Sequence, residues 1–168
     1  MNKEILNELN EKIGTSIPEN LITDVQKEEE NHFDVFTTPD KIYELTKLLC
    51  EKAGIYHLTT VTGMEKEKEF VVIYHLQYRN EETEKEIPIN VFVTEISKEK
   101  PKTPSLVDFF VAADYYEREV YDFFGIYFEN HPYMERLILP EKWPSDIHPL
   151  RKEYSVEDIR KIAEDVVK

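Results

Sequence analysis

FVVIYHLQY, residues 70–78, decides the fold. Apolar and aromatic side chains fall at every second position of this run, which is the period of a strand that buries one face of a sheet. Two further β-rich runs lie on either side of it, at 55–62 and 86–95. The connectors GMEKEKE and RNEETEK are charged and short enough for hairpin loops. The three runs therefore predict an antiparallel β-meander.

Two amphipathic helices precede the meander. Apolar residues recur at helical spacing over 3–13, and Gly14 follows as a stop signal. A second helix is predicted to begin at Thr38 and Pro39, a capping side chain before a proline in the first turn, and to end at Gly54. The run HFDVFT at 32–37 is predicted to be a short strand. The pattern indicates an α+β fold in which these helices cover one face of the sheet.

The chain changes character at 98–105, where KEKPKTPS combines two prolines with charge. A helix is predicted from a cap at Ser105 to Gly125, and 126–154 contains four prolines and no sustained period. A capping-box pattern at 155–158 then predicts a last helix. Its expected inward side chains are Val156, Ile159, Ile162, Ala163 and Val166. We expect one continuous domain made of an α/β module, 1–104, and a second part, 105–168, with a helix, an extended irregular segment and a C-terminal helix.

Composition excludes several classes of function. The formal net charge is −14, from 35 acidic residues against 21 Lys and Arg, which opposes attraction to nucleic acid. No apolar run approaches the roughly 20 residues of a bilayer span, and the first residues lack the apolar core of a signal peptide, so we expect a cytosolic chain. One cysteine, Cys50, cannot by itself hold an iron–sulfur cluster. The abundance of Lys and Glu and the presence of only two Gln favour a thermophilic source.

Polar groups lie on the apolar side of the predicted helix at 105–125. At 100° per residue, Glu117 falls on the same side as Ala113, Val120 and Phe124, so its carboxylate is expected to be buried. A buried carboxylate needs a cation or gives up its charge. The alternative is that the acids of this helix form surface ion pairs that contribute little to stability.

The helix also contains Arg118, which lies four residues from an acid on either side. These acids are Asp114 and Asp122. Because both can hold Arg118, the cation for Glu117 is expected to come from Arg136 or Arg151 in the irregular segment. We therefore predict a buried ion-pair network that fixes the shape of this segment and does not conduct protons.

Other interpretations of these residues lead to different chemistry. Glu119 points about 200° away from Glu117, so the two cannot act as an acid–base pair. His131 and His148 could form a metal site with Glu117, but prolines directly follow both, which suggests extended segments with structural hydrogen bonds instead. Trp143 is either an exposed anchor for a partner or a core residue under the loop.

The string YEREVYDFFGIYF at 116–128, followed by His131-Pro132, RLIL at 136–139 and HPLRK at 148–152, resembles the signature of the 30-kilodalton (C-type) subunit of respiratory complex I. The same subunit type occurs in energy-converting, membrane-bound nickel–iron (NiFe) hydrogenases and sulfur reductases. The resemblance is specific over 105–154 and architectural before it. Tyr133, Met134 and Glu135 depart from the usual family residues.

The resemblance implies a non-catalytic, peripheral subunit on the cytoplasmic side of the cell membrane, docked on the large catalytic subunit of an ion-pumping redox complex. No cofactor is expected in this chain; the NiFe centre and iron–sulfur clusters would lie in the large subunit and the iron–sulfur small subunit. The hydrogenase branch, which couples ferredoxin oxidation to proton reduction and ion translocation, is favoured over sulfur reductases and NADH- or other donor:quinone oxidoreductases.

The expected docking and structural network follows from the same motif. Its members are Tyr116, Glu117, Arg118, Glu119, Tyr121, Asp122, Gly125, His131, Pro132, Arg136, Trp143, His148, Pro149 and Arg151. No catalytic or metal-binding residue is expected. The remaining alternative is a free-standing domain in which the segment at 126–154 binds a small ligand.

Overall fold

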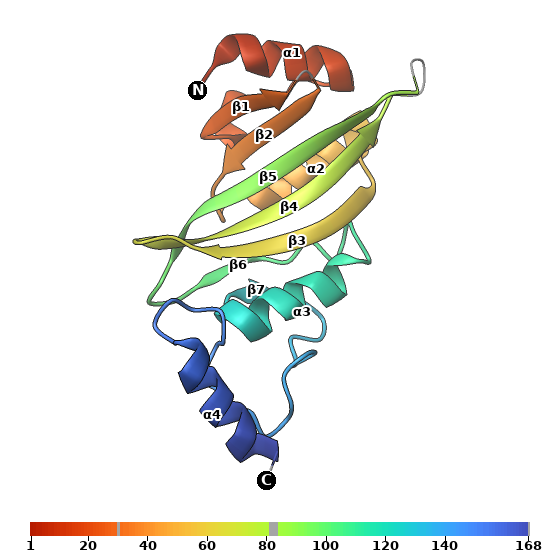
Figure 1. The fold of residues 1–168 in the computed structure, drawn as a ribbon. Helices are drawn as coiled ribbons and strands as arrows, with labels where there is room; N and C mark the ends of the chain where they lie inside the picture. The colour runs from red at the N-terminus through yellow and green to blue at the C-terminus, as the bar shows by residue number, and fades with distance from the viewer. Residues whose placement is uncertain (30, 81–83, 168) are drawn as a thin grey trace.

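The computed structural model describes residues 1–29, 31–80 and 84–167. It contains a five-stranded sheet, a two-stranded sheet, two α-helices in the first half of the sequence and two in the second (Figure 1). The helices are α1 (Lys3–Ile13), α2 (Ile42–Ala53), α3 (Ala113–Phe124) and α4 (Val156–Val167), with a short 3-10 turn at Glu19–Leu21. The strands are β1 (Asp24–Glu29), β2 (His32–Thr37), β3 (His57–Glu65), β4 (Glu69–Arg79), β5 (Glu86–Ser97), β6 (Lys102–Pro104) and β7 (Tyr127–Glu129).

The large sheet has the strand order β1-β2-β5-β4-β3. The predicted antiparallel meander is confirmed for β3, β4 and β5. The sheet as a whole is mixed rather than antiparallel, because β2 pairs with β5 in parallel, with Phe33 opposite Ile89 and Thr37 opposite Val93. After β2, helix α2 carries the chain to the far edge of the sheet, and the meander then returns until β5 lies beside β2. The charged strand β1 was not predicted.

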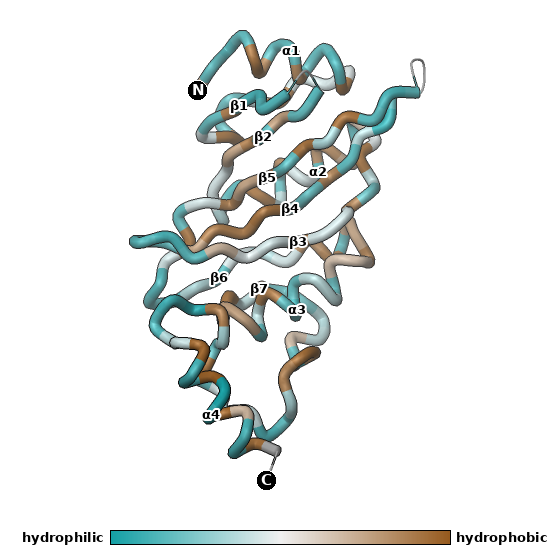
Figure 2. Tube along the Cα trace, in the orientation of Figure 1, coloured by the Kyte–Doolittle hydropathy of each residue, from teal (hydrophilic) through white to brown (hydrophobic). Residues whose placement is uncertain are grey.

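One face of the sheet forms the core with the helices. Of the alternating residues of β4 that were predicted to face inward, Phe70, Val72, Tyr74 and Leu76 are buried, whereas Tyr78 is only partly buried. Helix α2 lies behind the sheet in Figure 1, whereas α3 lies along the β3 edge. Colouring by hydropathy shows the apolar residues concentrated along the strands and one side of the helices (Figure 2). At the contact of α3 with β3, a Cβ at Gly63 would meet the Phe124 ring at 2.6 Å, so a glycine is needed for this approach.

The predicted boundaries of the first two helices are largely confirmed. Asn2 caps α1 by accepting a hydrogen bond from the amide of Glu4, and Gly14 and Gly54 end α1 and α2 in the left-handed conformation. Helix α2 starts at Ile42, a few residues later than predicted, because 38–41 form a turn in which the Thr38 carbonyl accepts from the amides of Lys41 and Ile42.

The predicted start of the third helix at Ser105 is wrong. Residues after Ser105 form turns, and α3 begins at Ala113. The apolar spacing that suggested one long helix instead reflects two consecutive segments that pack on the same core, to which Leu106, Phe110 and Ala113 all contribute. The short parallel pair β6 and β7, which was not predicted, brackets this region and brings 102–104 beside 127–129.

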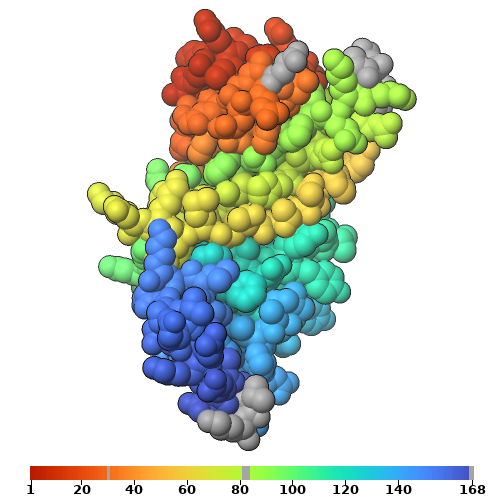
Figure 3. Space-filling view, viewed as in Figure 1, coloured from red at the N-terminus to blue at the C-terminus, as the bar shows by residue number. Residues whose placement is uncertain are grey.

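The last helix begins as predicted but is not packed as predicted. Ser155 and Asp158 form the capping box, in which the Ser155 hydroxyl accepts from the Asp158 amide at 3.2 Å. The side of α4 that was expected to face inward is half-buried at Ile159, Ile162, Ala163 and Val166, and Val156 is 73% exposed. In Figures 1 and 3, α4 lies at the end of the molecule farthest from α1. No helix in the described residues is long and apolar enough to cross a membrane.

Candidate docking site around helix α3

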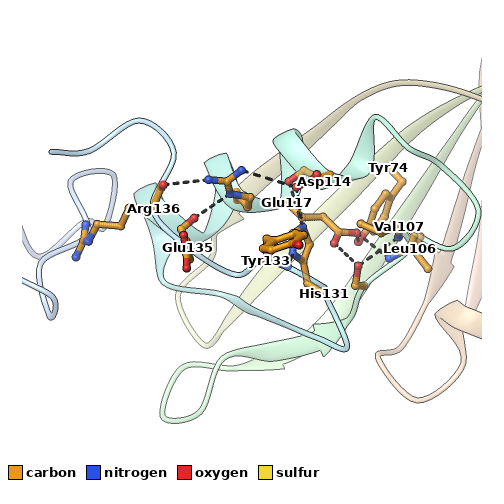
Figure 4. Close-up of polar contacts among 11 residues, drawn as sticks. Tyr74, Leu106, Val107, Asp114, Glu117, His131, Tyr133, Glu135 and Arg136 are labelled. Atoms are coloured by element: carbon orange, nitrogen blue, oxygen red, sulfur yellow. Dashed lines mark hydrogen bonds and ion pairs between the residues drawn. The ribbon is translucent and has the colours of Figure 1, made fainter. Parts of the chain in front are cut away.

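Glu117 lies at the centre of the contact between α3 and the sheet. Its side chain is fully buried, as the helical period predicted. The carboxyl group accepts hydrogen bonds from the Tyr74 hydroxyl at 2.9 Å, the Ser105 hydroxyl at 2.6 Å and the Leu106 amide at 2.8 Å (Figure 4). One carboxyl group thus joins β4, the turn that follows β6, and α3.

The predicted ion pair between Glu117 and Arg136 or Arg151 is wrong. No Lys, Arg or His of the described residues lies within 4.0 Å of this carboxyl group as an ion-pair partner. Burial raises the pKa of Glu117 to about 7; the three hydrogen bonds lower it in part, and the charge of Asp114 raises it further. The helical period located the buried side chain correctly, but it could not show that neutral groups of β4 and the turn reach the carboxyl first.

Asp122, five residues further along α3, is the other buried acid of this helix. Its Oδ2 accepts hydrogen bonds from three successive backbone amides, those of Leu137, Ile138 and Leu139, at 2.7–3.1 Å. Its Oδ1 lies 3.9 Å from the Arg136 guanidinium. Asp122 was expected to hold Arg118; instead, it anchors the segment 136–139 to the helix.

The arginines of the motif mostly bind backbone carbonyls. Arg118 pairs with Asp114 at 3.8 Å, as predicted, but its Nε and Nη2 donate to the carbonyls of Glu135 and Arg136. Arg136 donates to the carbonyl of Pro144 at 2.9 Å. These bonds satisfy backbone groups that have no partner in a helix or strand, which explains how an irregular segment can be ordered.

Arg151 and His148 close the C-terminal end of α3. Arg151 donates to the carbonyl of Phe124 at 2.8 Å and lies over the Phe70 ring, and His148 Nδ1 contacts the carbonyl of Asp122 at 3.0 Å. Gly125, the left-handed cap of α3, has φ 71°, and a Cβ there would collide with both side chains. Gly125 is therefore needed for its conformation and for the space that it leaves.

The two histidines are held apart. His131 lies at the start of α3, where it contacts the carbonyl of Asp114 at 3.2 Å and accepts a hydrogen bond from the amide of Tyr133. His148 lies at the other end of α3. Each makes structural hydrogen bonds, as the prolines that follow them suggested. In the part of the chain that the structure describes, no group of three or more His, Cys, Asp and Glu is placed to hold a metal ion.

Trp143 is a core residue under the loop and not an exposed anchor. It is 7% exposed, and its indole donates to the carbonyl of Ile147 at 2.9 Å. Tyr121 is half-buried, with its ring 6.4 Å from Tyr127 and 6.2 Å from His148. Tyr116 and Pro149 are half-buried, whereas Glu119 and Pro132 are exposed.

Sequence reasoning missed Tyr74 and Ser105 as partners of Glu117. Ser105 was interpreted as a helix cap, and Tyr74 as an ordinary core residue. The available signal was the hydroxyl of a tyrosine in the middle of a strand predicted to be buried, because such a hydroxyl requires a partner.

Exposed apolar side chains are frequent in the part of the chain that contains this network. Among the described residues, six of the eleven large hydrophobic side chains that are exposed lie in 105–154, and a seventh follows directly after it. They are Val111, Tyr115, Tyr127, Tyr133, Ile138, Leu150 and Val156. In the space-filling view, this part of the chain forms the lower portion of the molecule, beneath the strands of the large sheet (Figure 3).

A family model described as "Respiratory-chain NADH dehydrogenase, 30 Kd subunit" matches residues 35–160, which include the whole of this network. The chain belongs to this family. The resemblance predicted from the motif at 116–152 is therefore confirmed. The match also extends well before the motif, over the sheet.

Similar proteins carry names that agree with this family assignment. The C-type subunit of the NADH-quinone oxidoreductase of Roseiflexus sp. (strain RS-1) is 31% identical over 149 residues, which is 85% of this chain and 80% of that protein. The corresponding protein of Chloroherpeton thalassium is 48% identical over 63 residues, but the match spans 38% of this chain and only a quarter (25%) of that protein.

A solved structure shares the fold. The structure of the membrane-bound sulfane sulfur reductase, an archaeal respiratory membrane complex, contains a chain that matches with a TM-score of 0.76 over 99% of this chain and 92% of that one. The two sequences are 24% identical, so this likeness concerns the fold alone.

Proposed function

We propose that this protein is a non-catalytic, peripheral subunit of a complex-I-related, ion-pumping membrane redox complex, and that the segment 105–154 docks it on the large catalytic subunit. The observation that carries the docking surface is the concentration of exposed apolar side chains over 111–156. Clustered exposed apolar surface typically marks a contact with another protein. Family membership supports the class of complex, since the named relatives are subunits of NADH-quinone oxidoreductases.

The segment is well suited to docking because its own chain already shapes it. Side-chain hydrogen bonds hold it in place. Asp122 and Arg118 bind its backbone, and Arg151 binds the carbonyl at the end of α3. The exposed apolar side chains of Ile138 and Leu150 are thus presented by a backbone held at both ends. Pre-ordering of this kind lowers the conformational entropy that association would otherwise cost.

We further propose that the complex belongs to the NiFe hydrogenase branch, with the NiFe centre and iron–sulfur clusters in the large and small partner subunits and none in this chain. The Lys- and Glu-rich composition of the chain supports this branch, which would couple ferredoxin oxidation to proton reduction and ion translocation. The subunit would lie on the cytoplasmic side of the membrane, attached through its partners.

A sulfur reductase or a quinone reductase is the second candidate. The names of the sequence relatives favour the quinone reductase. Activity of the purified complex separates the three branches: hydrogen evolution from reduced ferredoxin, reduction of sulfane sulfur, or reduction of a quinone.

The docking proposal is tested by purifying the complex through a tag on this chain in its own host. Ile138→Asp and Leu150→Asp place a charge in the proposed surface, and we expect each to reduce the recovered large subunit at least about tenfold, which corresponds to about 1.4 kcal/mol. Tyr56→Asp is the matched control, because Tyr56 is 80% exposed but lies in the sheet module. Loss of the large subunit with Tyr56→Asp, and not with the other two variants, would contradict the proposal.

The same preparation tests the cofactor assignment. Iron and nickel should accompany the large and small subunits and be absent from the isolated chain, which we expect to be colourless. A stoichiometric transition metal in the isolated chain would overturn the assignment of all cofactors to partner subunits.

A further inference from the structure

Among the described residues, the carboxyl group of Glu117 receives hydrogen bonds from neutral donors alone. It is fully buried, and its three hydrogen-bond partners are two hydroxyls and one backbone amide. Among the described residues, no cation forms an ion pair with it. A buried carboxyl group without a cation is stabilised by taking up a proton, because burial penalises only its charged form.

We propose that Glu117 is a proton-binding site: the folded chain holds a proton on this carboxyl group at pH values at which an exposed glutamate is ionised and releases it as the pH rises further, which makes the attachment of α3 to the sheet dependent on pH. This inference concerns the chain itself and does not rest on the identity of the partner subunits.

The hydrogen-bond geometry accommodates both protonation states. When Glu117 is ionised, the Ser105 hydroxyl donates to Oε2 at 2.6 Å. When Glu117 is protonated, Oε2–H can donate to the same hydroxyl oxygen, which already accepts from the Val107 amide at 3.2 Å. The bonds from Tyr74 and Leu106 end on the other oxygen, Oε1, and need not change. The two protonation states therefore differ in the direction of one hydrogen bond, the one between Ser105 and Glu117.

The charged groups nearby favour the protonated state. Asp114, one turn earlier on α3, adds negative charge, and His131 and Arg118 contact Asp114 and not Glu117 (Figure 4). In the turn at 105–108, Asp108 accepts from the hydroxyl of Tyr43 in α2, at 2.8 Å. From the sheet, Tyr74 is the titratable partner, and its own pKa is raised well above the usual value by burial and by Glu117. Desolvation, and after it the charge of Asp114, raise the pKa of Glu117 to about 7, against the three hydrogen bonds from Ser105, Leu106 and Tyr74, which lower it.

The test is a carbon-13 NMR titration of the full chain with labelled glutamate side-chain carboxyls. The resonance absent from Glu117→Gln identifies Glu117; if that variant does not fold, the resonance most displaced by Tyr74→Phe identifies it. We expect its midpoint to lie within about one pH unit of 7, whereas exposed glutamates titrate near 4.5. Tyr74→Phe removes a donor to the ionised form, so it should raise the midpoint further. Tyr78→Phe, on the same face of β4, is the control and should leave the midpoint unchanged.

Two results would overturn the proposal: titration of Glu117 together with the exposed glutamates, or a midpoint that Tyr74→Phe leaves in place or lowers. The pH dependence of the attachment of α3 to the sheet is measured separately. Amide hydrogen exchange at Leu106 and along α3, relative to that along β5, should become faster as the pH passes the midpoint in the wild-type chain but not in Glu117→Gln. Equal behaviour of the two chains would remove the link between the proton and the attachment of α3.

Discussion

Helix α3 buries two carboxyl groups, about 140° apart around its axis, and the chain stabilises them in different ways. Glu117 faces the sheet and receives hydrogen bonds from two hydroxyls and one amide, and no cation in the described part of the chain pairs with it. Asp122 faces the irregular segment and receives three backbone amides, with Arg136 at 3.9 Å. The first group attaches the helix to the sheet; the second attaches the segment to the helix.

The difference shows how a side chain of one type can serve two purposes. A carboxylate that accepts three backbone amides beside a guanidinium is the partner of several groups at once, so removing it leaves those groups unpaired. A carboxyl group among neutral donors is close to the balance between its two forms, so replacing it with an isosteric amide changes little. The predictions below test this contrast, from the largest expected effect to the smallest.

Asp122→Ala should be the most damaging substitution. It removes the acceptor for the amides of 137–139 and leaves Arg136 without its carboxylate, so we expect a loss of about 3–5 kcal/mol in the free energy of unfolding. Urea denaturation of the full chain measures this loss. Glu119→Ala on the exposed side of the same helix is the control and should change stability by less than about 0.5 kcal/mol. Equal effects of the two variants would mean that Asp122 does not anchor the segment.

Glu117 should give the chain a pH dependence of the opposite sign to that of an ordinary acid. Its pKa is raised from 4.5 to about 7 on folding, so the folded state binds the proton more tightly. The resulting stability is fully present below about pH 4.5 and is lost as the pH rises through about 7, by roughly 3 kcal/mol. The unfolding free energy of the wild type should therefore fall relative to that of Glu117→Gln between pH 5 and pH 8. A constant difference would show that Glu117 is ionised throughout.

Gly125→Ala measures how closely the segment packs on the end of α3. Gly125 and Gly54 have nearly the same φ, 71° and 70°, but only at Gly125 would a Cβ meet other side chains. Gly54→Ala should cost about 1 kcal/mol through its backbone conformation. Gly125→Ala should cost about 1–2 kcal/mol more, because His148 and Arg151 must move. Equal losses would indicate that these two side chains are not packed against α3.

His148 should give the smallest effect. Burial lowers its pKa, and the charges of Arg151 and Arg136 lower it further, although its contact with the Asp122 carbonyl acts in the other direction. Its contribution to stability is therefore present above about pH 6.5 and is lost as the pH falls through the lower pKa of the folded state. His148→Gln should flatten the decline in melting temperature below pH 6.5, and an unchanged decline would contradict this assignment.

The sequence was informative wherever a regular period extended over a whole element. Alternation identified β4, and helical spacing followed by Gly14 and Gly54 identified α1 and α2. It could not show that β2 pairs with β5 in parallel, because that pairing joins segments more than fifty residues apart. The charged strand β1 is stabilised by pairing with β2 and not by an apolar face of its own, so its sequence lacks the signal.

Many members of the candidate site were predictable from the sequence, but Tyr74, Ser105 and the pattern of contacts were not. The burial of Glu117 followed from the helical period, but its partners Tyr74 and Ser105 come from elements whose positions the period does not fix. Asp122 was expected to hold Arg118, because nothing in the helix itself shows that 136–139 fold over that side. Likewise, nothing in the sequence of α4 shows which segment packs on its apolar side. That side matched the pattern of a buried face but is half-exposed.

The central claim is that this chain folds its own docking segment, with α3 as the support, and presents it to a large partner subunit. Amide hydrogen exchange, measured on the full chain alone and within the purified complex, tests this claim most directly. We predict that the amides of 137–139 are already protected in the isolated chain, since Asp122 accepts from them, and that the protection added by assembly falls mainly within 105–154. Unprotected amides at 137–139 in the isolated chain, or new protection mainly within 1–60, would contradict it.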